Sequence, residues 1–320
     1  MANDKPKILV SGSIVYDRIM VFPGFFKDHI LPNQTHILNV SFTLHKTEES
    51  FGGTGGNIAY NLALLRQPVV LLGLVGHDFA RYDKWLKKNK VDISKVKKSK
   101  DDPTASAYIM TDKADNQISG FYPGPMDVRY CHIVKKIKNI GLAIISPDFK
   151  PRMLEYAKIY NELGVPYIFD PGQQVTSFTV PELRRMVKGA SMLIGNDYEI
   201  KLILDKLALS SSKLEKLVDV LVVTRGAQGS EIYSENKKIK IPPAKVKNIV
   251  DPTGAGDAYR AGLIKGLLAG TSLGKAGRLA SLIGAYAVEH QGTQAHKFTL
   301  KEFESRYNKV FPARGGVSKK

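Results

Sequence analysis

Cysteine is nearly absent from this chain: Cys131 is the single one among 320 residues. One cysteine excludes an intramolecular disulfide, so the redox compartment is unconstrained. Long apolar runs are also missing, because none approaches the about 20 residues that a membrane-spanning helix needs. Residues 1–9 lack the apolar centre of a signal peptide. We therefore expect a cytoplasmic protein without a membrane partner.

Acidic residues are scarce relative to basic ones, with 30 Asp and Glu against 47 Lys and Arg and a formal net charge of +17. Clustered cations can bind nucleic acid by displacing counterions from its phosphates. However, no helix-turn-helix, zinc finger or RNA-binding aromatic motif accompanies them. Solvated helix faces, or attraction to small anionic substrates, explain the charge better, and a nucleic-acid partner is not expected. The seven histidines lack metal-ligand spacing, so a protein-held transition metal is not expected either.

Short apolar runs alternate with longer amphipathic stretches along most of the chain. Runs typical of buried strands occupy residues 7–11, 69–75, 142–146, 167–170, 192–195 and 220–224. Stretches with helical spacing occupy residues 57–65, 151–163, 181–188, 212–217 and 258–268. This alternation predicts an α/β fold with a mostly parallel sheet covered by helices on both faces. Ligands of such sheets bind beyond the carboxyl ends of the strands.

Two segments interrupt the alternation. Residues 18–50 and 104–122 contain β-type runs with no helix between them. They could pair with each other and form a small sheet that covers a site. We therefore expect one domain over residues 1–320, with these two segments as its lid.

The strongest local motif is Asp251-Pro-Thr-Gly-Ala-Gly-Asp257, followed directly by the helical stretch. Gly254 and Gly256 allow a tight turn in which backbone N–H groups converge at a helix start, which suits a phosphate. Asp257 would then lie beside the anion, where a carboxylate can accept a proton from an attacking hydroxyl. An aspartate that merely caps the helix is the alternative interpretation.

Familiar phosphate-binding motifs of other kinases are absent. The chain has neither the P-loop pattern G-x-x-x-x-G-K-[ST] nor the protein-kinase motif set. Its early glycine-rich segment is instead Phe51-Gly-Gly-Thr-Gly-Gly-Asn57, in which the glycines let backbone approach a ligand closely. The Asn57 amide could bind vicinal hydroxyls, or it could simply cap the following helix.

Together these two motifs resemble those of the ribokinase (PfkB-type) family of carbohydrate and nucleoside kinases. The early segment matches the family's GG-x-G-x-N pattern, and the late one matches its D-T/P-x-G-A-G-D pattern. Between them, Asn196-Asp-Tyr-Glu199 resembles N-x-x-E, and the segment from Thr224 to Gly229 resembles T-x-G-x-x-G. The resemblance spans almost the whole chain and implies a three-layer α/β sandwich with a small β-sheet lid.

The resemblance also implies roles for individual residues. Asp257 corresponds to the catalytic base, and the backbone of Gly254, Ala255 and Gly256 to the anion hole. ATP is implied as co-substrate beside Asn196, Thr224, Gly226 and Gly229. Mg²⁺ is implied near Glu199, held through water, and K⁺ is suggested near Asp251 and Thr253. Substrate hydroxyls would be bound by Asp17, Gly53 and Asn57.

Within this family the chain looks most like the bacterial adenosine kinases. Ser13 and Ser41 match polar positions of the nucleoside pocket, Phe121 matches a lid phenylalanine that stacks on the purine, and Gln173 and Gln174 match a glutamine pair near the nucleoside. One departure is Ala107, where that branch can carry a second aromatic residue, so the pocket could be roomier.

The resemblance implies transfer of the γ-phosphate of ATP to the 5′-hydroxyl of a nucleoside, adenosine first. A sugar kinase of the ribokinase or fructokinase type is the near alternative. A basic nucleic-acid-binding protein that has lost transfer activity is the distant one, and the intact glycine turn with Asp257 argues against it. A homodimer formed through the lid is also compatible with the resemblance.

Overall fold

A nine-stranded sheet forms the centre of the computed structural model, which describes residues 5–30, 39–114 and 116–312. The strand order is β13-β12-β11-β10-β9-β8-β1-β4-β5. All neighbours pair in parallel except β12 and β13, which form an antiparallel edge. The strands are β1 (Lys7–Ser11), β4 (Val69–Val75), β5 (Val96–Lys98), β8 (Ile140–Ile145), β9 (Tyr167–Phe169), β10 (Met192–Asn196), β11 (Val220–Thr224), β12 (Ser230–Ser234) and β13 (Lys237–Ile241).

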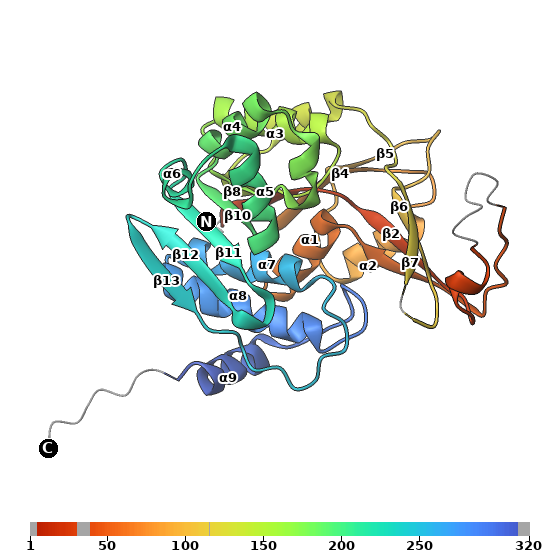
Figure 1. Ribbon diagram of the computed structural model, residues 1–320. Helices are drawn as coiled ribbons and strands as arrows, with labels where there is room; N and C mark the ends of the chain where they lie inside the picture. The colour runs from red at the N-terminus through yellow and green to blue at the C-terminus, as the bar shows by residue number, and fades with distance from the viewer. Residues whose placement is uncertain (1–4, 31–38, 115, 313–320) are drawn as a thin grey trace, which may run out of the picture.

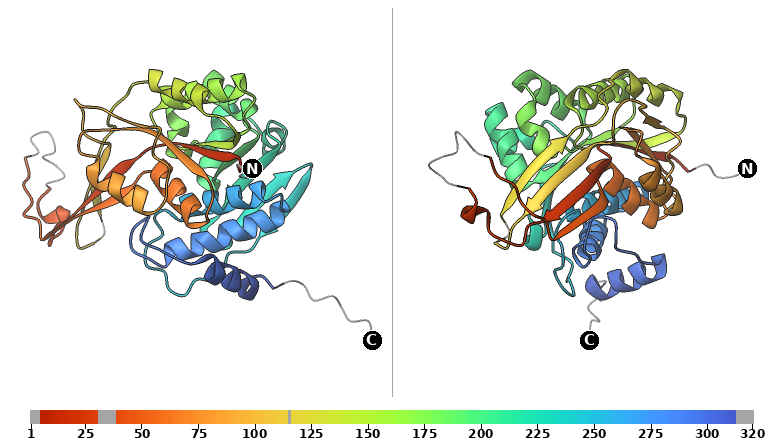
Figure 2. Two further views of the ribbon diagram at one scale, coloured as in Figure 1. Left: turned by 180° about the vertical axis from the view of Figure 1, so that it is seen from behind. Right: turned by 90° about the vertical axis from the view of Figure 1, so that its right-hand side faces the viewer.

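Alternate side chains of these strands enter two separate cores. In β1, Ile8 and Val10 pack on one face, whereas Leu9 packs on the other. The first core is covered by α1 (Thr54–Leu64), α2 (Ala80–Lys88), α7 (Ala255–Leu268), α8 (Leu273–Val288) and α9 (Leu300–Val310). The second is covered by α3 (Lys150–Glu162), α4 (Val180–Gly189), α5 (Asp197–Leu207) and the short α6 (Ser211–Glu215). The predicted three-layer α/β fold is therefore confirmed (Figures 1 and 2).

A second, four-stranded sheet lies beside the main one, and we call it the lid (Figure 1). It consists of β2 (Val15–Val21), β3 (Lys46–Gly52), β6 (Ser106–Thr111) and β7 (Gln117–Tyr122), in the order β3-β2-β6-β7. The parallel pairing of β2 with β6 joins the two segments that were predicted to form a small sheet. Residues 31–38 of the first segment lie outside the described residues.

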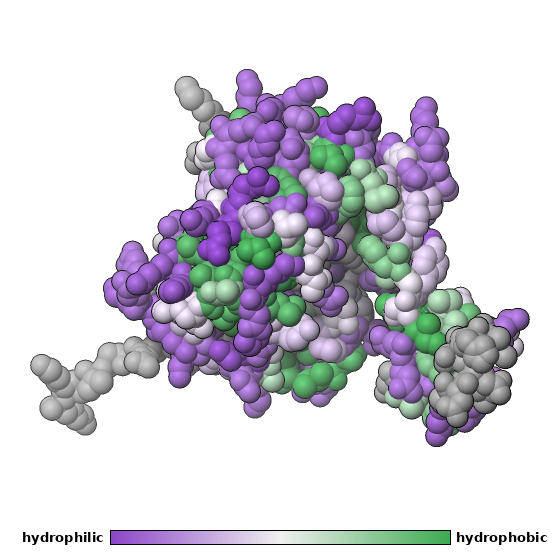
Figure 3. Space-filling view, turned by 45° about the horizontal axis from the view of Figure 1, so that its top comes forward, coloured by the Kyte–Doolittle hydropathy of each residue, from purple (hydrophilic) through white to green (hydrophobic). Residues whose placement is uncertain are grey.

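The surface agrees with the charged composition. Figure 3 shows one face that is mostly hydrophilic, with smaller apolar patches near its middle. In the described part of the chain, no helix combines the length and apolarity required to span a bilayer.

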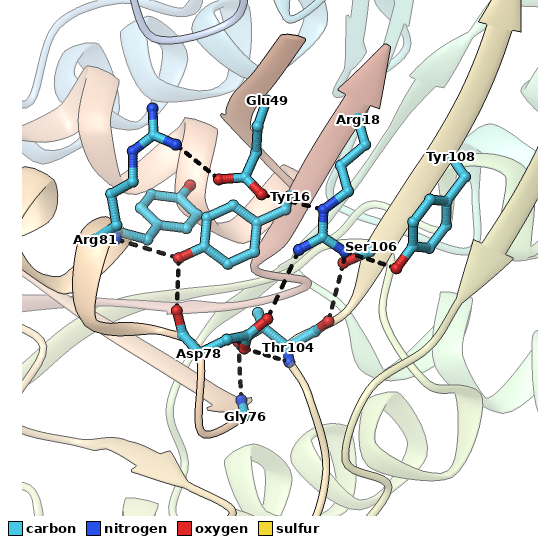
Figure 4. Close-up of polar contacts among 10 residues, drawn as sticks. Tyr16, Arg18, Glu49, Gly76, Asp78, Arg81, Thr104, Ser106 and Tyr108 are labelled. Carbon is cyan, nitrogen blue, oxygen red and sulfur yellow. Dashed lines mark hydrogen bonds and ion pairs between the residues drawn. The ribbon is translucent and has the colours of Figure 1, made fainter. Parts of the chain in front are cut away.

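An ionic cluster around Arg18 fastens the lid to the body (Figure 4). The Arg18 guanidinium on β2 contacts Glu49 on β3 at 3.1 Å and donates to the Tyr108 hydroxyl on β6 at 2.6 Å. It also approaches Asp78, which precedes α2, at 3.8 Å, and Asp78 accepts from the Thr104 backbone N–H at 2.7 Å. Three lid strands are thus joined to the body by one side chain.

We predict that Arg18→Met loosens the lid without unfolding the body. Hydrogen bonds to a charged partner typically contribute about 1.5–3 kcal/mol. Amide hydrogens of β6 and β7 should therefore exchange on the order of tenfold faster, measured by hydrogen–deuterium exchange, while those of β1 and β8 keep their rates. The control is Lys46→Met, because among the described residues Lys46 pairs only with exposed Glu48, at the end of the same sheet. Equal exchange in the Arg18 variant and the wild type would contradict a fastening role.

Candidate active site

The glycine turn, residues 251–257, leads into α7 as the sequence predicts. Gly254 adopts φ 78°, and a Cβ there would lie 2.9 Å from the Thr293 side chain, so glycine is required. The N–H groups of Gly254, Gly256 and Asp257 make no hydrogen bond to any described residue. Unpaired donors at a helix start form a site for an anion.

Asp257 lies in the first turn of α7 and is partly buried. It accepts a 2.8 Å hydrogen bond from the Asn57 amide on α1. Burial raises the pKa of Asp257 to about 7, although nearby Arg260 and the Asn57 hydrogen bond oppose the rise. A carboxyl group with this pKa exchanges protons near neutral pH, as a general base must.

Asn57 is itself fixed from the other side. Its Oδ1 accepts from the Thr293 hydroxyl at 2.8 Å and from the Gln294 amide at 2.9 Å. Gln294 in turn accepts from the Trp85 indole at 3.0 Å. Asn57 was predicted to bind substrate hydroxyls; the structure also gives it the position of a residue that holds the base.

Asp17 on β2 faces the same region. Its carboxylate makes no hydrogen bond to any described residue, and burial raises its pKa to about 6. A Cβ on Gly52 would overlap the Asp17 carboxylate, so this glycine makes room for it. The negative charge of Asp17 contributes to the raised pKa of Asp257, which places the two carboxylates near each other.

The lid register puts Phe121 on the same face as Asp17. Asp17 pairs with Ala107, and Ala107 pairs with Phe121, so the three residues form one cross-strand row. Directly paired residues point to the same face of a sheet. The Phe121 side chain is 61% exposed and is therefore not a core residue. Ala107 leaves open space between the acidic and the aromatic end of the row.

Ser13 and Gly53 lie together at the start of α1. The Ser13 hydroxyl accepts from the Thr54 backbone N–H at 3.1 Å. Gly53 has φ 83°, and a Cβ there would lie 2.6 Å from the Ser13 carbonyl oxygen. Both predicted residues therefore shape the backbone that precedes Asn57.

Three residues predicted to bind the substrate, Ser41, Gln173 and Gln174, make no contact with the described residues around Asp17 and Asp257. Ser41 is exposed outside any strand, and its neighbour Phe42 packs on Phe22, beyond the end of β2. Gln173 is exposed and Gln174 partly exposed, in a 3-10 turn that follows the buried Asp170. Their roles stay predictions.

A cavity of about 700 Å³ adjoins the glycine turn. The predicted nucleotide residues Thr224, Gly226 and Gly229 line one side, and Ala255 and Gly256 of α7 line another. Gly226 and Gly229 have φ values of 51° and 87°, which favour glycine. The remaining wall is mostly apolar and comes from residues 243–252 and 281–288.

Asn196 and Glu199 form a capping box at the start of α5. Asn196 Oδ1 accepts from the Glu199 N–H, and a Glu199 carboxylate oxygen accepts from the Asn196 N–H, both at 2.8 Å. Burial raises the pKa of Glu199. The described residues contain no group of three or more His, Cys, Asp or Glu side chains that could hold a metal. The water-mediated contact of Glu199 with Mg²⁺ stays a prediction.

Asp251 ties the glycine turn to the loop after α8. Its carboxylate accepts from the backbone N–H groups of Thr253 and Gly292, both at 2.9 Å. The pKa of Asp251 is lowered, because these hydrogen bonds to the carboxylate outweigh the opposing effect of its partial burial. The carboxylate thus has a structural role here, and the K⁺ site suggested near Asp251 and Thr253 stays a prediction.

Sequence reasoning missed a buried ion pair next to the base. Arg260, one turn after Asp257, is 7% exposed and pairs with Asp170, which is 1% exposed and follows β9. The separation of 90 residues hides this pair from any local pattern. Asp170-Pro-Gly at the carboxyl end of a buried strand was the available signal. The segment Gln291-Gly-Thr-Gln294 resembles the bacterial adenosine kinases, but the contacts of Thr293 and Gln294 with Asn57 were not predicted.

Comparisons with known proteins agree with this geometry. Residues 5–299 match the family model described as pfkB family carbohydrate kinase. The nucleoside kinase of Methanothermobacter thermautotrophicus is 35% identical over 81% of this chain and 84% of its own length. A Burkholderia thailandensis nucleoside kinase structure in complex with inosine has a TM-score of 0.85 and 37% identity, and covers 96% of this chain and 99% of that one; the same protein is also described in complex with ADP-inosine.

The Methanocaldococcus jannaschii nucleoside kinase structure, described as an archaeal member of the ribokinase family, is likewise similar. It has a TM-score of 0.84 and 30% identity, and covers 95% of this chain and 98% of that one. Sequence motifs, fold and site geometry thus lead to one conclusion: the chain belongs to the pfkB family of carbohydrate kinases.

Proposed function

We propose that this chain is an ATP-dependent nucleoside kinase that phosphorylates the 5′-hydroxyl of adenosine. The observation that carries the proposal is the partly buried Asp257 carboxylate, with its raised pKa, beside the unpaired N–H groups of the glycine turn. The similar proteins named nucleoside kinase, and the inosine complex of one of them, support a nucleoside substrate.

The chemistry follows from the positions of these groups. Asp257 accepts the proton of the 5′-hydroxyl as that oxygen attacks the γ-phosphorus of ATP. The N–H groups of Gly254 and Gly256 stabilise the negative charge on the transferring phosphoryl group. Asn57 holds the base in place. Mg²⁺ bound with the nucleotide would neutralise phosphate charge, with Glu199 contacting it through water.

Substrate recognition is divided along the cross-strand row of the lid. The unpaired Asp17 carboxylate accepts hydrogen bonds from ribose hydroxyls at one end. Phe121 offers an exposed ring for stacking with the nucleobase at the other end. Free sugars share the hydroxyls but have no base, so this row favours a nucleoside over the sugar-kinase alternative.

The proposal includes the wider setting that the sequence suggests. We place the enzyme in the cytoplasm, in purine salvage, with K⁺ near Asp251 and Thr253. A homodimer would form through the lid, whose outer strands β3 and β7 each have one edge that no described strand pairs with.

Asp257→Asn should lower kcat by at least about 10²–10⁴, because it removes the proton acceptor. The Kd values for ATP and adenosine should stay within a few-fold, since the amide keeps the size of the carboxylate. Steady-state kinetics and equilibrium binding measure both. The control is Asp205→Asn, in which an exposed helical carboxylate is changed. More than a tenth of wild-type kcat in the Asp257 variant would rule out this residue as the base.

The same substitution should stabilise the protein more at high pH than at low pH. Folding raises the pKa of Asp257 from 3.8 to about 7, so wild-type stability is lost as pH rises between these values. Asparagine does not ionise and escapes this loss. Chemical denaturation should show the advantage of Asp257→Asn growing by roughly 2–3 kcal/mol between pH 5 and pH 8. A constant advantage would mean that Asp257 is not held in a desolvated site.

Phe121→Ala should weaken adenosine binding about 10–100-fold, because base stacking on an aromatic ring contributes about 1–3 kcal/mol. Weak turnover of free ribose should stay unchanged, since ribose has no base to stack. The matched control is Ile118→Ala, which truncates an exposed apolar side chain on the opposite face of the same strand. Equal losses for both substrates would make Phe121 structural, and a wild-type preference for ribose or fructose would favour the sugar-kinase alternative.

A further inference from the structure

Arg260 has one guanidinium nitrogen that its ion pair does not use. Nε and Nη2 donate to the two carboxylate oxygens of Asp170, the latter at 2.6 Å. Nη1 makes no hydrogen bond to any described residue. The Arg260 side chain is 8% exposed, and the side chain of its partner Asp170 is 1% exposed. A rigid, oriented cation therefore has a free donor.

The free nitrogen lies against the glycine turn. Arg260 follows Gly256 by four residues in α7, and helical side chains lean toward the N-terminus, so the guanidinium reaches back over Gly256. A Cβ on Gly256 would lie 2.9 Å from Nη1. Gly256 also lines the 700 Å³ cavity, together with the predicted nucleotide residues Thr224, Gly226 and Gly229. Nη1 is thus next to the place where the phosphate is expected.

Local charge gives a reason for a cation here. The guanidinium interacts with Asp170, Asp257 and Glu199, three carboxylates at one edge of the sheet. A polyphosphate brought among these carboxylates would be repelled unless a positive charge stood between them. A purely structural role would need only the ion pair with Asp170 and would leave no reason for a free Nη1. Stability is also a weak reason for the pair, because buried ion pairs add little net stability. The unused N–H beside unpaired backbone donors indicates an anionic ligand.

We infer that Arg260 is a catalytic residue whose Nη1 donates to an oxygen of the transferring phosphoryl group, with Asp170 as its positioning residue. This rests on the proposed kinase function. The 5′-oxygen forms a bond to the γ-phosphorus, and the bond from that phosphorus to the β,γ-bridging oxygen breaks. The electron pair leaves with ADP, and the proton passes to Asp257. Nη1 stabilises the charge that spreads over the phosphoryl oxygens as this happens.

Arg260→Met should lower kcat about 10²–10³-fold while the KM for adenosine changes little, because the lost interaction belongs to the transition state. Arg260→Lys should recover only part of the rate, since an ammonium cannot bind Asp170 and the phosphoryl group in the same fork. The matched control is Arg152→Met. Arg152 also forms a buried pair with an aspartate, Asp148, and donates to the Pro125 carbonyl oxygen. It should lose stability but keep kcat.

Binding of a transition-state mimic separates catalysis from structural support. Wild type should bind ADP, Mg²⁺ and adenosine more tightly when aluminium fluoride is added, and Arg260→Met should lose most of that gain while keeping its affinity for ADP alone. Guanidinium ion should partly restore turnover of Arg260→Ala. Both effects should persist at pH 9, well above the pKa of about 7 that Asp257 has beside Arg260. Loss of Arg260 would raise this pKa, so a rate that recovers at pH 9 would mean that Arg260 acts only on the base.

The outcomes distinguish the two proposals. Wild type that makes no ADP in the presence of any nucleoside would refute the proposed function itself. An active wild type whose Arg260→Met variant keeps more than a third of kcat, or recovers fully at pH 9, would overturn the role of Arg260 as a phosphoryl contact. If the Met variant does not fold, Arg260→Lys must show the reduced aluminium fluoride gain, and an undiminished gain overturns the inference.

Discussion

The desolvated carboxylate of Asp257 is the constraint on which the rest of the proposed site depends. A carboxylate loses hydration when it is buried, and it stays usable as a base only if the surrounding groups hold it without neutralising it. The structure meets this with one hydrogen bond from Asn57, which is anchored by Thr293 and Gln294 from the other end of the chain. The helix α1 and the loop after α8 must therefore close on each other before the Asp257 carboxylate is held in place.

The site is rich in acidic residues, whereas the molecule as a whole is basic. The chain carries a formal net charge of +17, yet Asp17, Asp170, Glu199 and Asp257 gather where the glycine turn meets the sheet, and burial raises the pKa values of three of them. A uniformly acidic pocket would repel the phosphates that the unpaired N–H groups are shaped to receive. Arg260 resolves this conflict locally, because its guanidinium lies among three of these carboxylates. The positive surface can attract nucleotides from solution, but the geometry near the turn decides where their charge is held.

Local patterns predict what depends on neighbours in sequence. Apolar runs such as residues 69–75 give the buried strands because parallel strands are covered on both faces. The glycine spacing predicts the turn at Gly254, because a backbone with positive φ favours glycine. The edge strand β13 was not predicted, since its lysines face solvent and interrupt the apolar pattern. The Arg260–Asp170 pair and the anchors of Asn57 were missed because they join residues 90 and more than 230 positions apart. Such contacts follow from topology and not from spacing.

In the proposed function, the lid register couples recognition of the sugar to recognition of the nucleobase. Asp17, Ala107 and Phe121 occupy neighbouring strands on one row, so two strand spacings, about 10 Å, separate the acidic end from the aromatic end. A slip of one residue would turn Phe121 or Asp17 to the opposite face and destroy both functions of the row. The ionic cluster around Arg18 lies on that opposite face and joins β2, β3 and β6 to the body (Figure 4). The Arg18 contacts thus fix the distance between Asp17 and Phe121, and the small side chain of Ala107 leaves space between them, which the proposed function assigns to the nucleobase.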